Sequence, residues 1–410
     1  MRRISFLFII SLLLLMICEC NSKKYNDLTE NIPSDGFVGI IKIDMPGFDD
    51  LDDNTLRQKD ILPLIDTFRF VKLELTDESL IGDIDKLDVF EDRIYIMDMQ
   101  TSSLFVFDIN GKYLFKIDDI GQGPQEYIQL DFFDIDRKKR QLVLTDLMGY
   151  RILRYDMDGN FISKHEIPFR VEWTAPVDGG YSMYANYRDN SDKFNKEYNL
   201  FIMDSTMNIK KNYFPYNSSV FNNPRMKFSP TGIFYYYNDS CRFLSTHYST
   251  LYDIDINGLR AKYRFDFGEH TFDPDILSGK REKIDLYLND QSYYMLSFLT
   301  ENDSLLNFAY TLSSFPIFFY GYFSKNSGNI IYSAGFTIGE SEYFRGHPLA
   351  AYDSWFISEL RVGEMLEWKE DVKKKGLKTD SKWIKEKKIA LENITEDDNP
   401  VLILYKLKPF

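Results

Sequence analysis

The chain has 410 residues, of which 63 are acidic and 49 are basic, so its formal net charge is −14. This acidic balance argues against a general nucleic-acid-binding protein, which needs a basic surface. Hydrophobic residues make up 44% and aromatic residues 16% of the chain, which excludes a disordered protein and favours strands over helices.

The first residues are typical of an export signal. Two arginines precede an apolar run over residues 4–17, which has the length of a signal-peptide core and is too short to span a membrane. Cys18 and Cys20 end this run, and a polar segment follows. A cysteine at such a junction is similar to the acylation site of a bacterial lipoprotein. We therefore predict a signal peptide over residues 1–19 and lipidation at Cys20, with Cys18 as the alternative and an unlipidated secretory signal as the other interpretation.

The next part of the chain repeats with a period close to 48 residues. Asp98 and Asp146, Asp108 and Asp156, Gly111 and Gly159, and Asp156 and Asp204 are each 48 positions apart, and Asp255 follows Asp204 by 51. Each copy holds short alternating runs, and Asp108–Gly111 and Asp156–Gly159 are turns of the kind that joins two antiparallel strands. A repeat of this length with about four strands is typical of one β-propeller blade. We interpret the repeated aspartates as turn residues and not as a ring of metal ligands.

The later copies are less regular. The expected strands lie at 232–237 in a fourth blade, 316–323 and 329–333 in a fifth, and 350–357 and 401–407 in a sixth. Two helical insertions are predicted, one over about Pro274 to Leu299 and one over about Leu360 to Glu392 with a break at Gly376. A half-exposed strand over Phe68 to Leu75 precedes the first full blade, and we expect it to pair with the last strand and close the ring.

Four stretches carry a resemblance to a known family: residues 73–83, 93–108, 120–127 and 398–408. They resemble the six-bladed β-propeller lipoproteins of gut-type Gram-negative bacteria, which are distantly similar to NHL-repeat propellers. Family members typically have Gly-x-Gly-Pro-Gly-Glu-Tyr in one loop, where this chain has Gln125 for the third glycine. The resemblance covers about residues 67–410 and implies secretion and lipid anchoring, but it supplies no catalytic residues because the family has no settled activity.

Together these observations predict an all-β fold, a six-bladed β-propeller of four-stranded antiparallel blades with two short helical insertions in the C-terminal half. The expected organisation is a signal peptide over residues 1–19, a tether over 20–66 and the propeller over 67–410. The expected location is the cell envelope, as an outer-membrane lipoprotein on the periplasmic or the surface face.

Residues with catalytic chemistry form no recognisable motif. His165, His247, His270 and His347 are at least 23 positions apart, so no paired-histidine metal motif exists. A Gly-x-Ser-x-Gly nucleophile motif is also missing. Cys241 is expected to be a buried hydrophobe, and Gly121–Tyr127 is expected to be a tight connection between blades and not a phosphate loop. We predict no catalytic residues, no metal and no cofactor.

Two classes of function stay open. The favoured one is a non-enzymatic module that binds a glycan, a peptide or a partner protein. It would contact the membrane only through the lipid anchor and would bind no nucleic acid. The alternative is a propeller hydrolase or lyase acting on a saccharide or lactone. Three or more buried acidic or histidine groups at the channel mouth would favour the enzyme, whereas an aromatic rim would favour binding. Aromatic residues could stack on sugars there, but we interpret most of them as core; the candidates are Trp173, Trp355, Trp368, Trp383 and the tyrosine-rich stretches 181–187 and 235–237.

Overall fold

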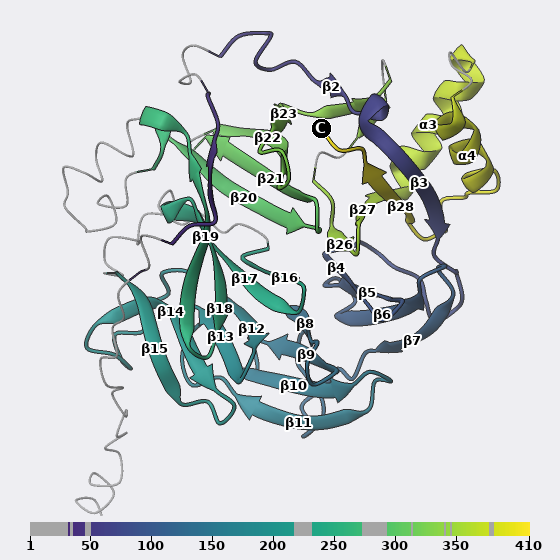
Figure 1. Ribbon diagram of the computed structural model, residues 1–410. Coiled ribbons are helices and arrows are strands. Elements are labelled where there is room, and N and C mark those ends of the chain that lie inside the picture. Colours follow the sequence, from purple (N-terminus) through teal and green to yellow (C-terminus); the bar gives the residue numbers. More distant parts are fainter. Residues whose placement is uncertain are drawn as a thin grey trace, which may run out of the picture.

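Six four-stranded antiparallel sheets surround a common axis in the computed structural model of the protein (Figure 1). The structure describes residues 32, 36–45, 51–216, 232–272, 293–312, 315–339, 342–344, 347–376 and 381–410. The predicted all-β class and the six-bladed β-propeller architecture are confirmed.

Each blade is described by its strands from the axis outward. Blade 1 contains β4 (Lys86–Phe90), β5 (Arg93–Asp98), β6 (Ser103–Asp108) and β7 (Tyr113–Ile117), and blade 2 contains β8 (Phe132–Asp136), β9 (Gln141–Asp146), β10 (Arg151–Asp156) and β11 (Phe161–Glu166). Blade 3 contains β12 (Trp173–Val177), β13 (Gly180–Tyr184), β14 (Glu197–Asp204) and β15 (Ile209–Tyr216), and blade 4 contains β16 (Phe234–Tyr237), β17 (Ser240–Ser245), β18 (Thr250–Asp255) and β19 (Gly258–Asp266). Blade 5 contains β20 (Tyr294–Glu301), β21 (Leu305–Leu312), β22 (Phe315–Ser324) and β23 (Ile330–Ser333), and blade 6 contains β26 (Ala350–Tyr352), β27 (Trp355–Leu360), β28 (Val401–Leu407) and β3 (Ile65–Lys72).

The ring closes through contacts between neighbouring blades. Inner strands contact one another from β4 to β8, from β8 to β12, from β16 to β20 and from β20 to β26, and β26 returns to β4. Blade 3 meets blade 4 where β12 contacts β17. The first strand of each blade therefore lies nearest the axis.

The repeated hairpin turns form as predicted. The carboxylate of Asp108 accepts hydrogen bonds from the backbone N–H groups of Asn110 and Lys112, at 2.8 and 2.9 Å. Gly111 adopts a φ of +90°, a left-handed conformation that glycine tolerates without strain. Asp156 repeats this turn in blade 2, where Gly159 has a φ of +84°.

The predicted ring closure is confirmed, with shifted boundaries. Strand β3 pairs antiparallel with β28, from Lys72 opposite Val401 to Ile65 opposite Leu407. The strand ends at Lys72 and does not continue to Leu75, whose side chain is 43% exposed. The chain turns away there because the backbone N–H of Glu74 donates to the carbonyl oxygen of Gly111 in blade 1.

The later blades contain corrections. Residues 350–357 form a hairpin and not one strand, because Asp353 has a φ of +52° and joins β26 to β27. The first helical insertion was predicted to end at Leu299, but β20 already begins at Tyr294. The rest of that insertion, over residues 274–292, lies outside the described residues. Strand β21 was not predicted, although it is buried along its whole length.

The second predicted insertion is a pair of helices between β27 and β28. Helix α3 spans Val362–Lys375 and helix α4 spans Lys382–Ala390, and the break falls at Gly376, with a φ of +72°. The indole ring of Trp383 on α4 packs against the rings of Phe68 and Phe70 on β3, at centroid distances of 4.7 and 5.3 Å. In the described part of the chain, no helix has the length and apolar character needed to cross a bilayer.

Two N-terminal strands join the propeller within the range expected to be a tether. Strand β1 (Gly39–Lys42) lies parallel to β19 and makes a fifth strand at the outer edge of blade 4. Strand β2 (Lys59–Asp60) pairs with β24 (Phe336–Ile338), which pairs with β25 (Glu342–Phe344) in a small separate sheet. Strand β1 therefore lies outside blade 4, and the segment before β2 lies at the end of blade 5, where the hydroxyl of Ser333 donates to the carbonyl oxygen of Arg57.

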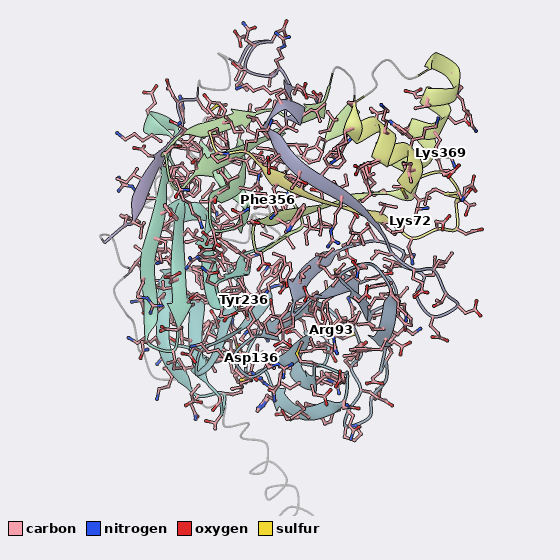
Figure 2. All side chains as sticks on the ribbon, turned by 45° about the vertical axis from the view of Figure 1, so that its right-hand side comes forward. Lys72, Arg93, Asp136, Tyr236, Phe356 and Lys369 are labelled. Atoms are coloured by element: carbon pink, nitrogen blue, oxygen red, sulfur yellow. The ribbon has the colours of Figure 1, made fainter. Side chains whose placement is uncertain are left out.

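Aromatic side chains pack between neighbouring blades, as at Phe356, which Figure 2 labels. Phe356 in blade 6 is fully buried beside Tyr322 of blade 5, whose hydroxyl lies 2.8 Å from that of Tyr405. In blade 3, Tyr181 is 1% exposed. Of the aromatic candidates from the sequence, Trp383, Tyr181, Tyr184 and Tyr187 are buried as core residues, whereas Trp173, Trp355, Trp368 and residues 235–237 are half-buried.

Candidate functional site

The inner strands of blades 1 and 2 place four charged side chains beside the axis. The Nζ of Lys86 on β4 lies 2.5 Å from Oδ1 of Asp134 on β8. The guanidinium group of Arg137, one residue beyond β8, donates to both oxygens of Asp88, at 2.7 and 2.9 Å. We call Lys86, Asp88, Asp134 and Arg137 the channel cluster. Its two acids and two bases balance in charge.

Aromatic rings border the channel cluster. The guanidinium carbon of Arg137 lies 5.1 Å from the ring centre of Phe90 and 5.7 Å from that of Tyr236. Tyr236 reaches inward from blade 4, and its hydroxyl donates to the carbonyl oxygen of Pro176 in blade 3 at 2.7 Å. Side chains of blades 1, 2 and 4 and a backbone carbonyl of blade 3 therefore meet at this site.

The environment of Asp134 differs from that of an exposed carboxylate. Its side chain is 5% exposed, and burial raises its pKa to about 6 against the opposing effect of the Lys86 ammonium group. A carboxyl group that changes charge near pH 6 can act as an acid or a base. Here, however, its oxygen is already held by Lys86, so a reaction would first have to displace this partner.

The repeated aspartates serve as backbone acceptors, as predicted. Asp98 is fully buried and accepts from the backbone N–H groups of Gly82 and Gln100. Asp146 is also fully buried and accepts in the same way from Ile128 and Gly149. Each carboxylate thereby fastens the segment that enters its blade. Within the described residues, no group of three His, Cys, Asp or Glu side chains could hold a metal ion.

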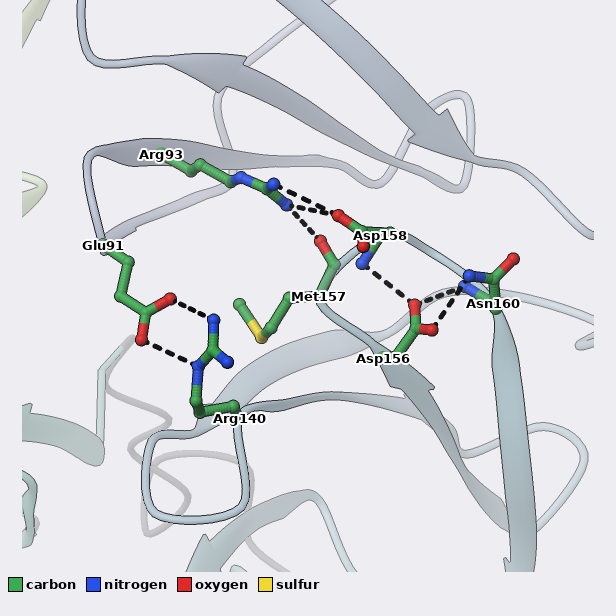
Figure 3. Close-up of polar contacts among 7 residues, drawn as sticks. All are labelled: Glu91, Arg93, Arg140, Asp156, Met157, Asp158 and Asn160. Carbon is green, nitrogen blue, oxygen red and sulfur yellow. Dashed lines mark hydrogen bonds and ion pairs between the residues drawn. The ribbon is translucent and has the colours of Figure 1, made fainter.

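Salt bridges between turns join blades 1 and 2 at one face of the ring (Figure 3). Arg140 donates to both oxygens of Glu91, at 2.8 and 2.6 Å, and Arg93 donates to the carboxylate of Asp158 and to the carbonyl oxygen of Met157. Glu91 and Arg140 lie in equivalent turns of the two blades, whereas Arg93 begins β5 and Asp158 lies in the turn between β10 and β11. These pairs fix neighbouring blades relative to each other. The hairpin aspartates keep their hydrogen bonds to the backbone of their own turns.

A second buried network joins blades 4 and 5. Glu301, with a side chain 1% exposed, accepts from Nε of Arg242 at 2.5 Å and lies 2.6 Å from Nζ of Lys325. Arg242 also pairs with Asp253. Sequence reasoning did not identify this network, because nothing in the spacing of these residues indicates that they meet. Its acids are paired with cations, as in the channel cluster.

The residues singled out from sequence lie apart. His247 is 2% exposed, and its Nδ1 lies 3.0 Å from the hydroxyl of Tyr187, at the junction of blades 3 and 4. Cys241 is a buried free thiol, as predicted. His165 lies on β11 of blade 2, whereas His347 stacks on Phe298 with ring centres 4.6 Å apart. Cys20 and Cys18 lie outside the described residues.

The glycine-rich segment connects blades 1 and 2, as predicted. The buried hydroxyl of Tyr127 donates to the carbonyl oxygens of Ser102 and Ile117. The carboxylate of Glu126 folds back onto the loop and accepts from the backbone N–H of Gly123 at 2.7 Å. The N–H of Gly121 donates to the carbonyl oxygen of Tyr127, so both glycine N–H groups are occupied. The carboxylate of Glu126 would also repel a phosphate, so the loop has a structural role.

An accessible groove of about 540 Å³ lies on the outside of the ring, between β3 and α4. Its lining comes from β3, from α4 and from the hairpin turn of blade 1; the residues are Arg69, Phe70, Val71, Lys72, Asn110, Glu386, Ile389 and Ala390. Sequence reasoning missed this groove because it exists only after β3 has joined blade 6 and α4 has packed against it.

Solved structures with similar folds were found, and no curated protein matches the chain. A protein of Bacteroides fragilis that is described as predicted to be exported is 21% identical, with a TM-score of 0.65 over 90% of this chain and 99% of that one. A member of the DUF4221 family from Bacteroides vulgatus is 10% identical, with a TM-score of 0.47 over 84% of this chain and 97% of that one. A virginiamycin B lyase from Staphylococcus aureus is 11% identical, with a TM-score of 0.33 over 65% of this chain and 73% of that one.

The first of these similarities shows that the two chains share a fold over nearly their whole length. A family model described as a domain of unknown function covers residues 49–406, and so includes all six blades and the strand that closes them. On this match, the chain belongs to the DUF4934 family.

Proposed function

We propose that the protein is an exported, lipid-anchored binding module of the cell envelope, whose ligand is a glycan, a peptide or a partner protein. The observation that carries the binding function is the pairing of the channel carboxylates. Asp88 and Asp134 are each held by a cation, whereas the accessible groove is lined by a strand edge and by apolar and cationic side chains. This arrangement suits recognition better than acid–base chemistry.

The export part of the proposal rests on the N-terminal sequence, and the similarity to a protein described as exported supports it. Metabolic labelling with an alkyne fatty acid tests the anchor. We expect label on the wild-type protein, none on a Cys20→Ala variant and undiminished label on a Cys18→Ala variant. Label that persists in Cys20→Ala would move the anchor to Cys18, and a wild-type protein without label would contradict lipidation.

Asp134 is the residue that the alternative function, a hydrolase or lyase, would use, because burial raises its pKa to about 6. The full-length protein in detergent can be tested against a glycan array, a peptide array and a panel of glycosides and lactones. We expect saturable binding to one ligand class without turnover, and unchanged binding in an Asp134→Asn variant. Turnover that disappears in Asp134→Asn would contradict the binding module and assign the channel as an active site.

A further inference from the structure

The groove beside α4 lies over the free edge of a β-sheet. Successive residues of a strand point to opposite faces of its sheet. The groove contacts four successive residues of β3, from Arg69 to Lys72, so it touches both faces. A hollow can do this only where it runs along the strand's edge. In blade 6, β28 covers the inner edge of β3, and β3 is the last strand of the sheet. The outer edge is therefore the floor of the groove.

The same molecule shows what such an edge can accept. In blade 4 the outermost strand is β19, which corresponds to β3 in blade 6. Strand β1 lies along its outer edge in parallel register, with Gly39 opposite Tyr263 and Lys42 opposite Asp266. The backbone N–H of Val38 extends this pairing by donating to the carbonyl oxygen of Lys262 at 2.8 Å. An extended segment thus completes one blade, and among the described residues blade 6 has no such fifth strand.

Two walls enclose the edge of β3 and leave room between them. On one side α4 is fixed by Trp383, which packs on Phe68 and Phe70. On the other side the hairpin turn of blade 1 is fixed by Arg69, whose guanidinium group donates to the carbonyl oxygen of Ile109 at 3.2 Å. Because both walls are anchored to β3 itself, the groove is formed before any ligand arrives.

The groove is basic, although the protein as a whole carries a net charge of −14. Its lining carries two cations, Arg69 and Lys72, and Lys72 is exposed at the end of β3 (Figure 2 labels Lys72). Glu386 is the acid among the lining residues, and its carboxylate lies 3.6 Å from Nζ of Lys382. Ile389, 71% exposed, adds an apolar contact at the rim. Charge complementarity therefore favours an acidic ligand with some apolar side chains.

We propose that this groove binds an extended, acidic segment of another protein, which adds to the edge of β3 as a fifth strand of blade 6. This inference rests on the proposed binding function and names its ligand class. Backbone hydrogen bonds to the strand edge would supply affinity, and Lys72 and Ile389 would select alternate side chains. Blade 6 is also the blade that closes the ring, so a bound strand would lie directly against the closing strand.

A designed peptide tests the proposal on the full-length protein in detergent. The probe is a fluorescein-labelled peptide of about six residues that alternates glutamate with valine, because strands of this length are common. We expect saturable binding by fluorescence anisotropy and slower hydrogen exchange of the β3 amides in the complex. A Lys72→Glu variant should bind about fivefold more weakly. Lys210→Glu, an exposed change on the outer strand of blade 3, is the matched control and should bind as the wild type does.

A second probe separates strand addition from charge attraction. The same peptide with alternate backbone nitrogens methylated keeps its charges but loses half of its strand donors, and we expect it not to bind. Equal binding of both peptides would overturn strand addition. If the peptide does not bind, and ligands found on the arrays bind the Lys72→Glu variant as well as the wild type, the groove proposal is overturned and the binding function stands. The proposed binding function would be contradicted by a different result, namely turnover in the glycoside and lactone panel that disappears in Asp134→Asn.

Discussion

Single buried polar groups make this propeller sensitive to pH, and His247 is the clearest case. Burial at the junction of blades 3 and 4 lowers its pKa from 6.5 to about 4. Tyr187 and Phe272 contact its ring, and both are uncharged between pH 4 and pH 7. Because the folded pKa lies below the unfolded one, His247 binds a proton more readily in the unfolded chain. Its destabilising effect on the folded protein is therefore absent above pH 6.5 and grows as the pH falls toward 4.

The direction of this pH dependence gives a prediction for a His247→Gln variant. The wild type should lose about 3 kcal/mol of unfolding free energy through this group between pH 7 and pH 4. The variant keeps a hydrogen-bonding side chain but cannot take up the proton, so its stability should fall less over this range. Chemical denaturation at several pH values measures the difference. The matched control is His270→Gln, in which a histidine outside this buried site is lost, and it should follow the wild type.

The difference between variants is the informative quantity, because Asp134 acts in the opposite direction. Its pKa is raised to about 6 in the folded protein, so its contribution to stability is present below pH 3.8 and is lost as the pH rises through 6. The two effects overlap in one pH range and partly cancel in the wild type. Parallel curves for the wild type and His247→Gln would contradict the assignment of the acid sensitivity to His247.

At the scale of single elements, local chemistry determined what could be predicted. The hairpin turns at Asp108 and Asp156 were found because a carboxylate and a glycine in fixed spacing have one low-energy backbone arrangement. Strand β28 was predicted with its observed bounds, because its apolar run stands between polar segments. The hairpin of β26 and β27 was missed because Asp353 adopts its left-handed conformation without a glycine to indicate it.

Contacts between elements could not be predicted in the same way. Lys86 and Asp134 are 48 positions apart, and their ion pair exists because two inner strands meet at the axis. The groove is a further example, since its floor, wall and rim come from three separate segments. Gly111 illustrates the limit. Its hairpin turn was predicted, yet the structure also brings it so close to the closing strand that a Cβ atom would overlap the carbonyl oxygen of Lys72.

At the scale of the whole molecule, β3 holds the ring shut. Blade 6 draws β26, β27 and β28 from the end of the chain and β3 from near its start, so the two ends are fastened by one strand pair. Val71 is buried at the junction with blade 1, and Phe70 packs under α4. Opening this pair would expose two sheet edges at once, and such edges readily pair with other chains.

A disulfide across the closing pair tests whether the ring opens there. Thr67 and Lys406 are directly opposite each other on β3 and β28, at a separation that a disulfide can bridge. In a Thr67→Cys/Lys406→Cys variant, oxidation would link the two ends of the propeller and restrict the unfolded chain by about 6 kcal/mol in the loop-entropy model. We expect the oxidised form to melt several degrees higher and to aggregate less on heating than the reduced form of the same variant. That comparison cancels the loss of the contact between Lys406 and Trp355, because both forms lack it. Identical melting of the two forms would show that unfolding begins in another blade, with β3 and β28 still paired.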